Sequence, residues 1–598
     1  MTRKPLSFAA AVFVTLLLFC AVTFYYPKYN AQQTEATISW DVAGYYYYLP
    51  AFFIYRDAKQ LRFTEDIMKR YQPSSQFDMA MPHESGNYVM KYSSGQAVMY
   101  APFFLIAHAY AKNSDFPTDG FSKPYQFAVS YGSLLFCIVG FWLLRTLLLR
   151  RFSDGVVAVT LLCIGIGTNY FEYASTSAPM THGHLFTLYT ALLLLTERFY
   201  ARPSYSAAAG IGAAIGLGML TRPTEVVAVI LPVLWGVGFP LLPALRERVL
   251  FLRRHVSKIL WAVSCTVVVG SLQLFYWKYA TGDWIVYSYG DQGFYWSRPH
   301  IIDGLWSYRN GWLTYSPMLY FALVGLTLLW VLRKNFALAC AAFAAVFIYV
   351  TFAWDIWWYG GSLGQRAMVQ AYPVLTFGFA GLVEVLTKRW QRVAFGLIAA
   401  FFVYYNAWLF HQAHHGGKYK SDQTTRAYFW KTFLTWKEDP DELKLLDTNE
   451  SFEGERRDVK QIYANDFEAT DSIMLCPDKI IQGQRTACVP PQGLSPEFGT
   501  SLTSHQGAWV RANATFLCSP KEWDTWQMPQ LLIRFYQGNE PVKDRMIRAH
   551  RFMNEGETRD LFIDSRIPEN ADSVTVHVWN PGQSKTTVFD NVRIEVFR

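Results

Sequence analysis

The sequence predicts an α-helical protein that crosses a membrane about eleven times and carries a β-sandwich domain at its carboxy-terminal end. Three observations support this fold class. The 598 residues are 52% hydrophobic and only 17% charged, whereas soluble domains are about 25% charged. Apolar stretches follow one another to about residue 411, with lysines and arginines clustered between them. Beyond about residue 455, short runs of alternating apolar and polar residues predict strands.

A helix that spans a bilayer needs about 20 apolar residues, because the hydrocarbon core is about 30 Å thick. We expect the first span over 7–24 and not a cleaved signal peptide, since its apolar run is long and ends in the aromatic anchor Phe24-Tyr25-Tyr26. The stretch 96–111 lacks flanking basic residues and predicts a helix that lies at the interface or re-enters it. The other ten predicted spans are 126–148, 155–172, 183–199, 206–220, 224–243, 259–279, 315–332, 335–354, 367–387 and 391–410.

The basic clusters predict which ends of these spans face the cytoplasm. When the spans alternate, six clusters fall on one side, which is the pattern of cytoplasmic loops. They are Arg3-Lys4, Arg150-Arg151, Arg198 with Arg202, Arg246 to Lys258, Arg333-Lys334, and Lys388-Arg389 with Arg392. The amino terminus is therefore predicted to be cytoplasmic in an inner membrane. The connections 27–125, 280–314 and 355–366 and the tail from 412 are predicted to lie on the periplasmic or equivalent exterior side.

Three segments are predicted along the chain. Residues 1–411 form a transmembrane domain whose first exterior loop is 27–125. Residues 412–455 form a linker in which Phe429, Phe433 and Trp436 recur at helical spacing and predict an amphipathic helix on the membrane surface. Residues 456–598 are predicted to be a periplasmic β-sandwich, with strands at 508–517, 530–537, 573–580 and 587–597.

The formal charge of +8 does not indicate a nucleic-acid-binding protein, because its lysines and arginines mark loops and form no continuous basic face. Three cysteines lie in the tail, Cys476, Cys488 and Cys518. In an oxidising compartment, Cys476 and Cys488 are the nearest pair for a disulfide, although the third thiol leaves the pairing open. No Cys-x-x-Cys pair or metal-type spacing of Cys and His occurs, which argues against a zinc site.

Polar residues beside a membrane are costly, so those near exterior span ends are candidates for function. The first is Asp41, which follows the first span in the aromatic segment Ser39 to Pro50. A carboxylate there could deprotonate an acceptor hydroxyl as a general base. The alternative is a helix amino-cap, because Asp favours that position and a helix is expected to begin there.

Later in the same loop, His83 and Glu84 precede Lys91 and Tyr92. The ammonium of Lys91 could reach a lipid phosphate at headgroup depth, or it could belong to a lysine that extends to the interface. Arg222 lies between two apolar runs with no aqueous loop. A guanidinium there needs a partner, either Glu225 or a bound phosphate.

Two further exterior segments combine aromatic and polar residues. Ser175 to His184 offers His182 and His184, and Trp354 to Arg366 offers Gln365 and Arg366. Aromatic faces with a few polar groups suit sugar rings, but Trp and Tyr are also common in a plain interfacial belt. The candidate substrate-binding residues are Lys91, Arg222, His83, Glu84, Tyr92, His182, Gln365 and Arg366, and no metal ligand is predicted.

At these residues the sequence resembles the GT-C class of integral-membrane glycosyltransferases, especially the branch with protein O-mannosyltransferases and aminoarabinose transferases. That branch carries an acidic residue followed by tyrosines in the first exterior loop, as Asp41 with Tyr45 to Tyr48 does. It also has a Lys-Pro-Pro type element before an apolar helix, similar to Lys91-Tyr92-Ser93. A Gly-rich span that ends in Leu-Thr-Arg-Pro is frequent there and is similar to Gly216 to Pro223.

The resemblance covers about residues 1–410, with two departures. Val42 stands where the branch has the second residue of an Asp-Glu pair, and Tyr92-Ser93 replaces the double proline. The tail, which ends in Val588 to Ile594, resembles jelly-roll carbohydrate-binding modules.

The resemblance implies transfer of a sugar from a polyprenyl-phosphate carrier to a glycan, lipid or protein acceptor at the exterior face. The resemblance implies that Asp41 takes the acceptor's proton as it attacks the anomeric carbon with inversion, and that Lys91 with Arg222 stabilises the departing phosphate. No cofactor is predicted, and a requirement for a divalent cation stays open. Two other classes remain as alternatives: a transporter or flippase of lipid-linked saccharides, and a non-catalytic sugar-binding membrane scaffold.

Overall fold

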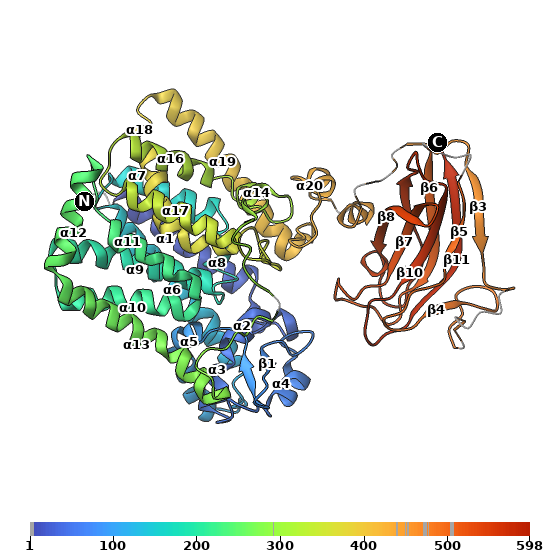
Figure 1. Ribbon diagram of the computed structural model, residues 1–598, viewed down its shortest axis with the longest axis horizontal. Coiled ribbons are helices and arrows are strands. Elements are labelled where there is room, and N and C mark those ends of the chain that lie inside the picture. The colour runs from blue at the N-terminus through green and yellow to red at the C-terminus, as the bar shows by residue number, and fades with distance from the viewer. Residues whose placement is uncertain are drawn as a thin grey trace. The chain divides into compact units, whose positions relative to one another are not determined.

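The computed structural model describes residues 5–290, 292–437, 440–448, 450, 452, 454–469, 475–476, 478–502 and 508–598. It divides into two compact units, Met1–Asp422 and Gln423–Arg598. Figure 1 draws the helices of the first unit in blue to yellow and the strands of the second in orange to red. Since the division follows Asp422, it cuts through the predicted linker 412–455, whose residues to 422 belong to the first unit and those from 423 to the second.

Every one of the eleven predicted spans coincides with helical structure. The helices are α1 (Leu6–Cys20), α6 (Lys123–Leu148), α7 (Asp154–Gly167), α9 (Thr181–Ala201), α10 (Tyr205–Thr221), η4 (Pro223–Val229) with α11 (Ile230–Leu234), α13 (Val256–Thr281), α16 (Leu319–Val331), α17 (Ala337–Phe352), α18 (Tyr372–Val385) and α19 (Arg389–His411). Among the described residues, five stretches are long and apolar enough to cross a membrane, and five further apolar helices are shorter. The protein is therefore a polytopic membrane protein. Arg3 and Lys4 lie outside the described residues.

The predicted span 224–243 is wrong in extent. Its helix ends at Leu234, and a new helix, α12 (Leu241–Arg254), begins after Pro240. Gly236 has a φ of +82°, a conformation that ends a helix and that L side chains rarely adopt. Because α12 has no buried residues and carries much of the basic cluster from Arg246, the connection predicted as a loop is an exposed helix.

Small residues let neighbouring helices of the first unit approach closely. A Cβ added to Gly325 of α16 would lie 1.8 Å from the carbonyl oxygen of Gly378 in α18. A Cβ on Gly212 of α10 would lie 2.1 Å from the carbonyl oxygen of Ala262 in α13. Contacts of this kind are typical of helix packing in membranes, where van der Waals contact replaces the hydrophobic effect as the main attraction.

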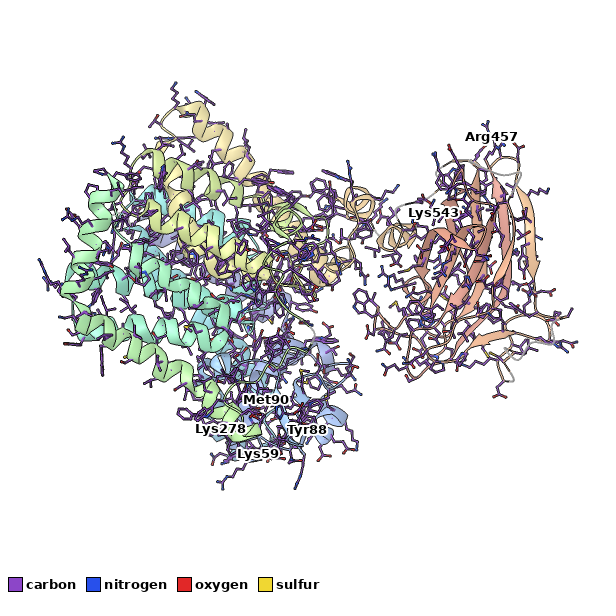
Figure 2. All side chains as sticks on the ribbon, viewed as in Figure 1. Lys59, Tyr88, Met90, Lys278, Arg457 and Lys543 are labelled. Carbon is purple, nitrogen blue, oxygen red and sulfur yellow. The ribbon has the colours of Figure 1, made fainter. Side chains whose placement is uncertain are left out.

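The long first loop is folded. It contains α2 (Trp40–Tyr46), α3 (Tyr48–Phe53), α4 (Thr64–Tyr71), the hairpin β1 (Ala80–Pro82) and β2 (Tyr88–Met90), and α5 (Gly95–Lys112). Figure 2 labels Tyr88 and Met90 on β2. The stretch 96–111 is thus helical, as the sequence indicated. Further short helices connect the spans: α8 (Tyr170–Tyr173), α14 (Ile301–Trp306), α15 (Trp312–Tyr315) and η5 (Arg366–Ala371).

The second unit is a sandwich of two antiparallel sheets around one apolar core. One sheet has the order β5-β10-β7-β8, and the other has the order β3-β11-β6-β9 with β4 paired to β11. The four predicted strands are confirmed as β6 (Trp509–Leu517), β7 (Gln530–Gln537), β10 (Ser573–Trp579) and β11 (Thr587–Phe597). The other strands are β3 (Lys460–Asn465), β4 (Ala487–Val489), β5 (Phe498–Ser501), β8 (Glu540–Arg548) and β9 (Thr558–Arg566).

The predicted amphipathic helix over Phe429, Phe433 and Trp436 is wrong in extent. Helix α20 (Arg426–Thr432) ends before Phe433, and Leu434 has a φ of +57° that no helix accommodates. Phe429 is buried within the unit, so it does not form one apolar face with the exposed Trp436. The tail cysteines Cys476, Cys488 and Cys518 are free thiols in this structure, although Leu475 and Ala487 beside the first two form a bridge between their segments.

Candidate functional site

Asp41 lies in the first turn of α2, one residue after Trp40, and its carboxylate is used for tertiary contacts. The amino-cap position belongs to Ser39, so the alternative of Asp41 as the cap is wrong. One carboxylate oxygen, Oδ2, lies 2.9 Å from Nη2 of Arg366, and the other, Oδ1, accepts a hydrogen bond of 2.6 Å from the Tyr92 hydroxyl. The side chain remains 28% exposed. Two predicted residues therefore meet Asp41 directly.

A rigid loop presents Arg366. The backbone N–H of Leu363 donates to the Tyr173 hydroxyl at 3.0 Å, and that of Gly364 donates to the Tyr419 hydroxyl at 2.8 Å. Gly364 has a φ of +61°, and a Cβ there would lie 3.2 Å from the Cβ of Tyr315. The predicted residue Gln365 donates its amide to the carbonyl of Trp357 and so supports the loop from inside. These contacts fix the guanidinium of Arg366 against Asp41.

Lys91 approaches the same place from the end of β2. Its Nζ lies 3.8 Å from Oδ2 of Asp78, and its charge is one of the influences felt by Asp41. The Tyr92 ring packs on Tyr45 with 4.4 Å between centroids. This approach requires Gly44, because a Cβ there would lie 2.5 Å from the Tyr92 ring. Asp78 was not foreseen from the sequence, where a single Asp in a polar loop gives no signal.

Arg222 ends α10 and lies near the aromatic side of the same cluster. Its guanidinium is 5.5 Å from the centre of the Tyr359 ring, and Tyr45 and Tyr289 lie within its electrostatic reach. It forms no ion pair with any carboxylate of the described residues. Glu225, the predicted partner, instead accepts hydrogen bonds from Tyr189 at 2.7 Å and Gln370 at 3.0 Å. Of the two partners suggested for Arg222, Glu225 therefore interacts with it electrostatically but without a direct ion pair.

His182 lies next to this network, and His83 and Glu84 lie apart from it. The Nδ1 atom of His182 is 2.9 Å from Oε1 of Gln370, so His182 contacts the residue that also binds Glu225. His83 instead lies in the turn of the β1–β2 hairpin, where it contacts Ser85 and, at 3.9 Å, Asp283. Glu84 is exposed in the same turn. Among the described contacts, none joins either residue to Asp41.

The electrostatics around Asp41 favour its charged form. Burial alone would raise the pKa of Asp41, but the Arg366 guanidinium, the Tyr92 hydroxyl and the Lys91 ammonium outweigh burial and hold the pKa below its usual range. The neighbouring carboxyl of Asp78 differs, because burial and the charge of Asp41 raise its pKa despite Lys91. At neutral pH the cluster therefore offers an ionised carboxylate beside several cations.

Tyrosines surround this cluster and remain neutral. Burial raises the pKa of Tyr289 to about 12, against the lowering influence of Arg222. Burial and the charge of Asp41 raise the pKa of Tyr92 well above its usual value, so its hydroxyl stays a donor to Asp41. Tyr45 lies within electrostatic reach of Asp41, Arg222 and Arg366 together. The predicted aspartate, lysine and two arginines therefore converge on one group of aromatic residues.

Among the described residues, no group of three or more His, Cys, Asp or Glu side chains could hold a metal ion. Asp41 and Asp78 have Arg366 and Lys91 as their cationic partners. No step is therefore assigned to a divalent cation.

Two cavities elsewhere in the protein do not include these residues. One, of about 550 Å³, is an apolar groove of the first unit that includes Leu17, Ile166 and Asn406 on α1, α7 and α19. The other, of about 460 Å³, lies in the second unit.

No family model matches the chain, and no curated protein matches it. The solved structures that are similar to it include the following two. The crystal structure of ArnT from Cupriavidus metallidurans in the apo state is 13% identical, with 68% of this chain and 69% of that chain covered and a TM-score of 0.40. The cryo-EM structure of the arabinosyltransferase EmbB from Mycobacterium smegmatis is 12% identical, with 98% and 64% covered and a TM-score of 0.32.

Both similar structures belong to the GT-C class of glycosyltransferases, the class that the sequence resembles. Because both TM-scores lie below 0.5, we infer function from the residues around Asp41 and not from these two proteins.

Proposed function

We propose that the protein is a membrane glycosyltransferase that moves a sugar from a polyprenyl-phosphate-linked donor to an acceptor hydroxyl at the exterior face of the membrane. The observation that carries this proposal is the position of Asp41: an ionised, partly exposed carboxylate between Arg366 and Tyr92, with Lys91 and Arg222 in the same cluster. A carboxylate beside several cations, at the edge of a membrane domain, suits a reaction in which a proton is taken up and a phosphate departs.

The reaction balances within this cluster. The acceptor oxygen forms a bond to the anomeric carbon of the donor sugar, and the bond between that carbon and the phosphate oxygen breaks. The acceptor proton passes to Asp41, and the bonding electrons leave with the phosphate. A single displacement of this kind inverts the anomeric centre, and its transition state has oxocarbenium character by analogy with glycoside hydrolysis.

The lowered pKa of Asp41 makes it a weak base but keeps it charged. A negative charge next to the developing oxocarbenium centre lowers the barrier before the proton moves, so the acceptor proton is transferred late. Arg366 and Tyr92 contact the two carboxylate oxygens and hold them in place. Arg366 and Tyr92 therefore orient the carboxylate of Asp41 and also lower its basicity.

The departing phosphate gains negative charge, and Arg222 is placed to meet it. Arg222 forms no ion pair among the described residues, although Glu225 attracts it electrostatically, and its guanidinium lies against the Tyr359 ring. A guanidinium with no carboxylate in direct contact can bind phosphate oxygens in a bidentate manner. Lys91 adds a second positive charge, which Asp78 keeps near the cluster.

The grouping of these charged residues also favours an enzyme over a transporter or flippase and over a non-catalytic sugar-binding scaffold. A transporter or flippase would need a path across the membrane, whereas these residues gather on the folded first loop and the ends of α10 and η5. A scaffold that only binds sugar would not need an aspartate held between an arginine and a tyrosine. We place the site at the exterior face on the basis of the basic clusters in the opposite loops.

Substitution of the base tests the proposal. Purified protein in detergent is given a synthetic polyprenyl-phosphate sugar and an acceptor, and transfer is measured together with donor affinity. Asp41→Asn should reduce turnover at least roughly a hundredfold, because a neutral amide can neither accept the proton nor stabilise the positive centre. Donor affinity should change little.

Asp66→Asn is the matched control, because Asp66 is an exposed carboxylate on α4 of the same loop. Its turnover should equal that of the wild type. Wild-type turnover in Asp41→Asn would exclude Asp41 as the base. Movement of labelled lipid across liposomes without sugar transfer by the wild type would instead identify a transporter.

A further inference from the structure

Helix α12 (Leu241–Arg254) joins two apolar helices of the first unit, α11, which ends at Leu234, and α13, which begins at Val256. Figure 1 draws α12 at one edge of this unit, across the direction of α13. The other end of α13 contacts the first loop, where the Tyr276 hydroxyl accepts the backbone N–H of Met90 at 2.9 Å. Since α13 has 26 residues and a helix rises about 1.5 Å per residue, its ends are about 39 Å apart, more than the roughly 30 Å of the hydrocarbon core. Helix α12 therefore lies at the membrane face opposite to the first loop.

One side of α12 is held against the unit. The guanidinium of Arg248 lies 3.8 Å from the centre of the Tyr200 ring and donates a hydrogen bond to the carbonyl of Trp235. Phe251, three residues further on, packs on the same ring with 5.0 Å between centroids. These contacts fix the orientation of the helix, so its other side faces away from the unit.

The side that faces away carries apolar and basic residues in one row. Leu242, Arg246, Val249 and Arg253 recur at spacings of four, three and four residues, which places them on one face of an α-helix. At about 100° per residue, this face is roughly opposite to the side that packs on Tyr200. All four side chains are exposed, Leu242 to 81% and Val249 to 48%. These four residues form the outer face of α12.

The charge of α12 and the turn after it is unbalanced. Glu247 is the one acidic residue of 241–258, against five basic residues, which are Arg246, Arg248, Arg253, Arg254 and Lys258. Among the described residues, neither Arg246 nor Arg253 forms an ion pair. Both arginines of the outer face thus project from the protein without a counter-charge.

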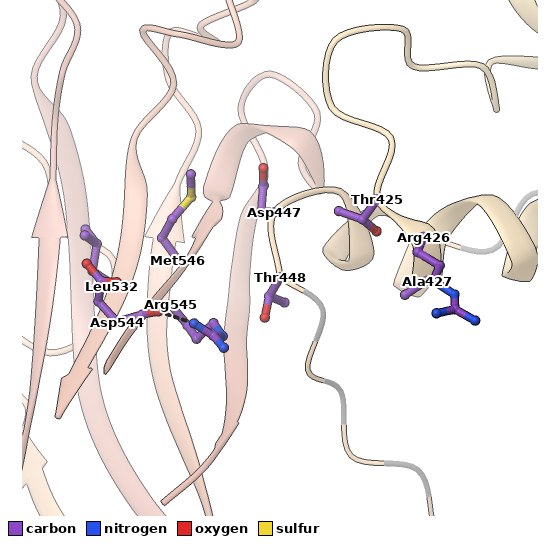
Figure 3. Close-up of a pocket in the computed structure, with 9 residues that line it drawn as sticks. All are labelled: Thr425, Arg426, Ala427, Asp447, Thr448, Leu532, Asp544, Arg545 and Met546. Atoms are coloured by element: carbon purple, nitrogen blue, oxygen red, sulfur yellow. Dashed lines mark hydrogen bonds between the residues drawn. The ribbon is translucent and has the colours of Figure 1, made fainter. Parts of the chain in front are cut away.

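Other exposed arginines of the protein do lie beside carboxylates. In the cavity that Figure 3 shows, Nη2 of Arg545 lies 3.6 Å from Glu450. Nη1 of Arg150, in a neighbouring connection of the first unit, lies 3.0 Å from Glu197. The protein therefore supplies a partner for these two cations and none for those of the outer face.

The combination of exposed apolar and basic side chains is typical of a helix that lies in the membrane interface. Leu242 and Val249 can enter the boundary of the acyl chains, while the long side chains of Arg246 and Arg253 reach back to lipid phosphates. A zwitterionic headgroup balances its phosphate with its own cation, whereas an anionic headgroup leaves its charge for the protein. The unbalanced arginines therefore favour anionic lipids.

We propose that the outer face of α12 binds anionic phospholipids, such as phosphatidylglycerol, in the leaflet opposite to the first loop. Arg246 and Arg253 bind the headgroup phosphate, and Leu242 and Val249 contact the acyl chains. The helices on both sides of α12 keep it at the bilayer, so lipid is always within reach. This binding goes beyond the proposed sugar transfer and does not rest on it.

Photo-crosslinking of the full-length protein in phosphatidylcholine liposomes tests the inference. The two probes are a phosphatidylglycerol and a phosphatidylcholine that have equal chains and the same photoreactive group near the headgroup, each at the same mole fraction. Mass spectrometry measures the label on peptides from residues 241–258. At low salt, phosphatidylglycerol should label these peptides about fivefold more than phosphatidylcholine or better, since each basic residue near the surface adds a factor of this size. The excess should fall as salt is added.

The double variant Arg246→Gln with Arg253→Gln should reduce the excess to less than about twofold, because two of the charges that attract the headgroup are lost. Both arginines are exposed and unpaired among the described residues, so the thermal midpoint in detergent should equal that of the wild type. Arg56→Gln with Arg62→Gln is the matched control, since it removes the same charge from exposed positions of the first loop. Its labelling of 241–258 should match the wild type.

Four results would overturn the inference. Equal labelling of the wild type by the two lipids would show that charge does not select the lipid. An unchanged excess in the double variant would show that the outer face does not bind the headgroup. Loss of the label when glycerol 1-phosphate is added would identify a site for a free phosphate. Absence of label from both lipids would show that another protein, and not the bilayer, covers the outer face.

The labelling is independent of catalysis. Asp41→Asn should be labelled as the wild type is, and a wild type that transfers no sugar would still show the lipid preference. Failure of the proposed function and failure of this inference are therefore distinguishable.

Discussion

Each unit contains a carboxylate–guanidinium pair, and the two pairs differ in their surroundings. In the helical unit, Asp41 lies 2.9 Å from Arg366, and the two side chains are 28% and 17% exposed. In the sandwich, Asp447 lies 2.5 Å from Arg548, and the two are 0% and 8% exposed. Asp447 also accepts a backbone N–H and approaches a second arginine, whereas Asp41 has one guanidinium and one hydroxyl.

The difference lies in how much of each carboxylate is left for a ligand. An ionised carboxylate has about four lone-pair sites. Those of Asp447 are taken up by the protein and sealed from water, so the pair contributes to the fold. Those of Asp41 are only partly used and remain open, so the pair can meet a substrate. Similar ion pairs therefore have different roles because of the residues around them.

Among the substitutions that leave Asp41 in place, Arg366→Gln should have the largest effect on activity. Loss of the guanidinium removes both the positive charge and the hydrogen bond that orient Asp41. Sugar transfer should fall roughly a hundredfold, measured as kcat/KM with a polyprenyl-phosphate sugar. Arg366→Lys should recover only part of it, since an ammonium does not reproduce the planar donor geometry.

Arg62→Gln, an exposed arginine of the first loop, is the control and should keep full activity. If Arg366→Gln kept its activity but unfolded readily, the Asp41 pair would be structural and the contrast with Asp447 would disappear.

Arg548→Gln in the sandwich should show its effect on stability. It leaves the carboxylate of Asp447 buried with only the more distant Arg551 as a cation. Removing one partner of a buried pair costs about 3–5 kcal/mol, because the remaining charge is uncompensated. Proteolysis in increasing urea should show the second unit opening at lower urea, while the first unit is unaffected. An unchanged urea midpoint would mean that Asp447 is not sealed as described.

Much of the helical unit was predictable because its signals are local. Apolar stretches of bilayer length and basic clusters lie within single segments, and all eleven predicted spans contain helix, although the helix of 224–243 ends at Leu234. The predicted helix boundaries were wrong where a residue with positive φ follows an early helix end, as at Gly236 and Leu434. Strands β3, β4, β5, β8 and β9 were not predicted, and in β8 and β9 charged residues interrupt the alternation. In β8, for example, Lys543 and Arg545 occupy less exposed positions on either side of the exposed Asp544 and contact Glu450.

The candidate site was predictable as a set of residues but not as an arrangement. Asp41, Lys91, Arg222 and Arg366 were each singled out because charges near span ends are costly. Nothing in the sequence ties Asp41 to Arg366, which is distant in the chain, and nothing separates His83 or Glu84 from the others. Only the fold shows that those two lie in a hairpin turn. Asp78 lies in no motif and became visible only through its contact with Lys91.

The smallest expected effect is that of Tyr92→Phe, which removes one hydrogen bond from the open pair and leaves the guanidinium. Loss of the 2.6 Å bond to Oδ1 should reduce kcat roughly fivefold, the size of about 1 kcal/mol. It should also change the pH dependence. In the wild type the Tyr92 hydroxyl helps to hold the pKa of Asp41 below its usual range, so the carboxylate stays charged until the pH falls below that range.

Without the hydroxyl the pKa of Asp41 rises, the carboxylate is protonated at a higher pH, and the acid limb of kcat/KM against pH moves upward. Any stability that the charged Asp41 contributes is present above its unfolded pKa and is lost as the pH falls through the folded pKa, so it too should disappear earlier on acidification. Tyr88→Phe on the same hairpin is the control, since no hydrogen bond of its hydroxyl is found among the described residues. An acid limb that does not move in Tyr92→Phe would mean that Asp41 is not the group whose protonation limits the reaction. Asp41, paired with Arg366, would then have a role other than that of the general base.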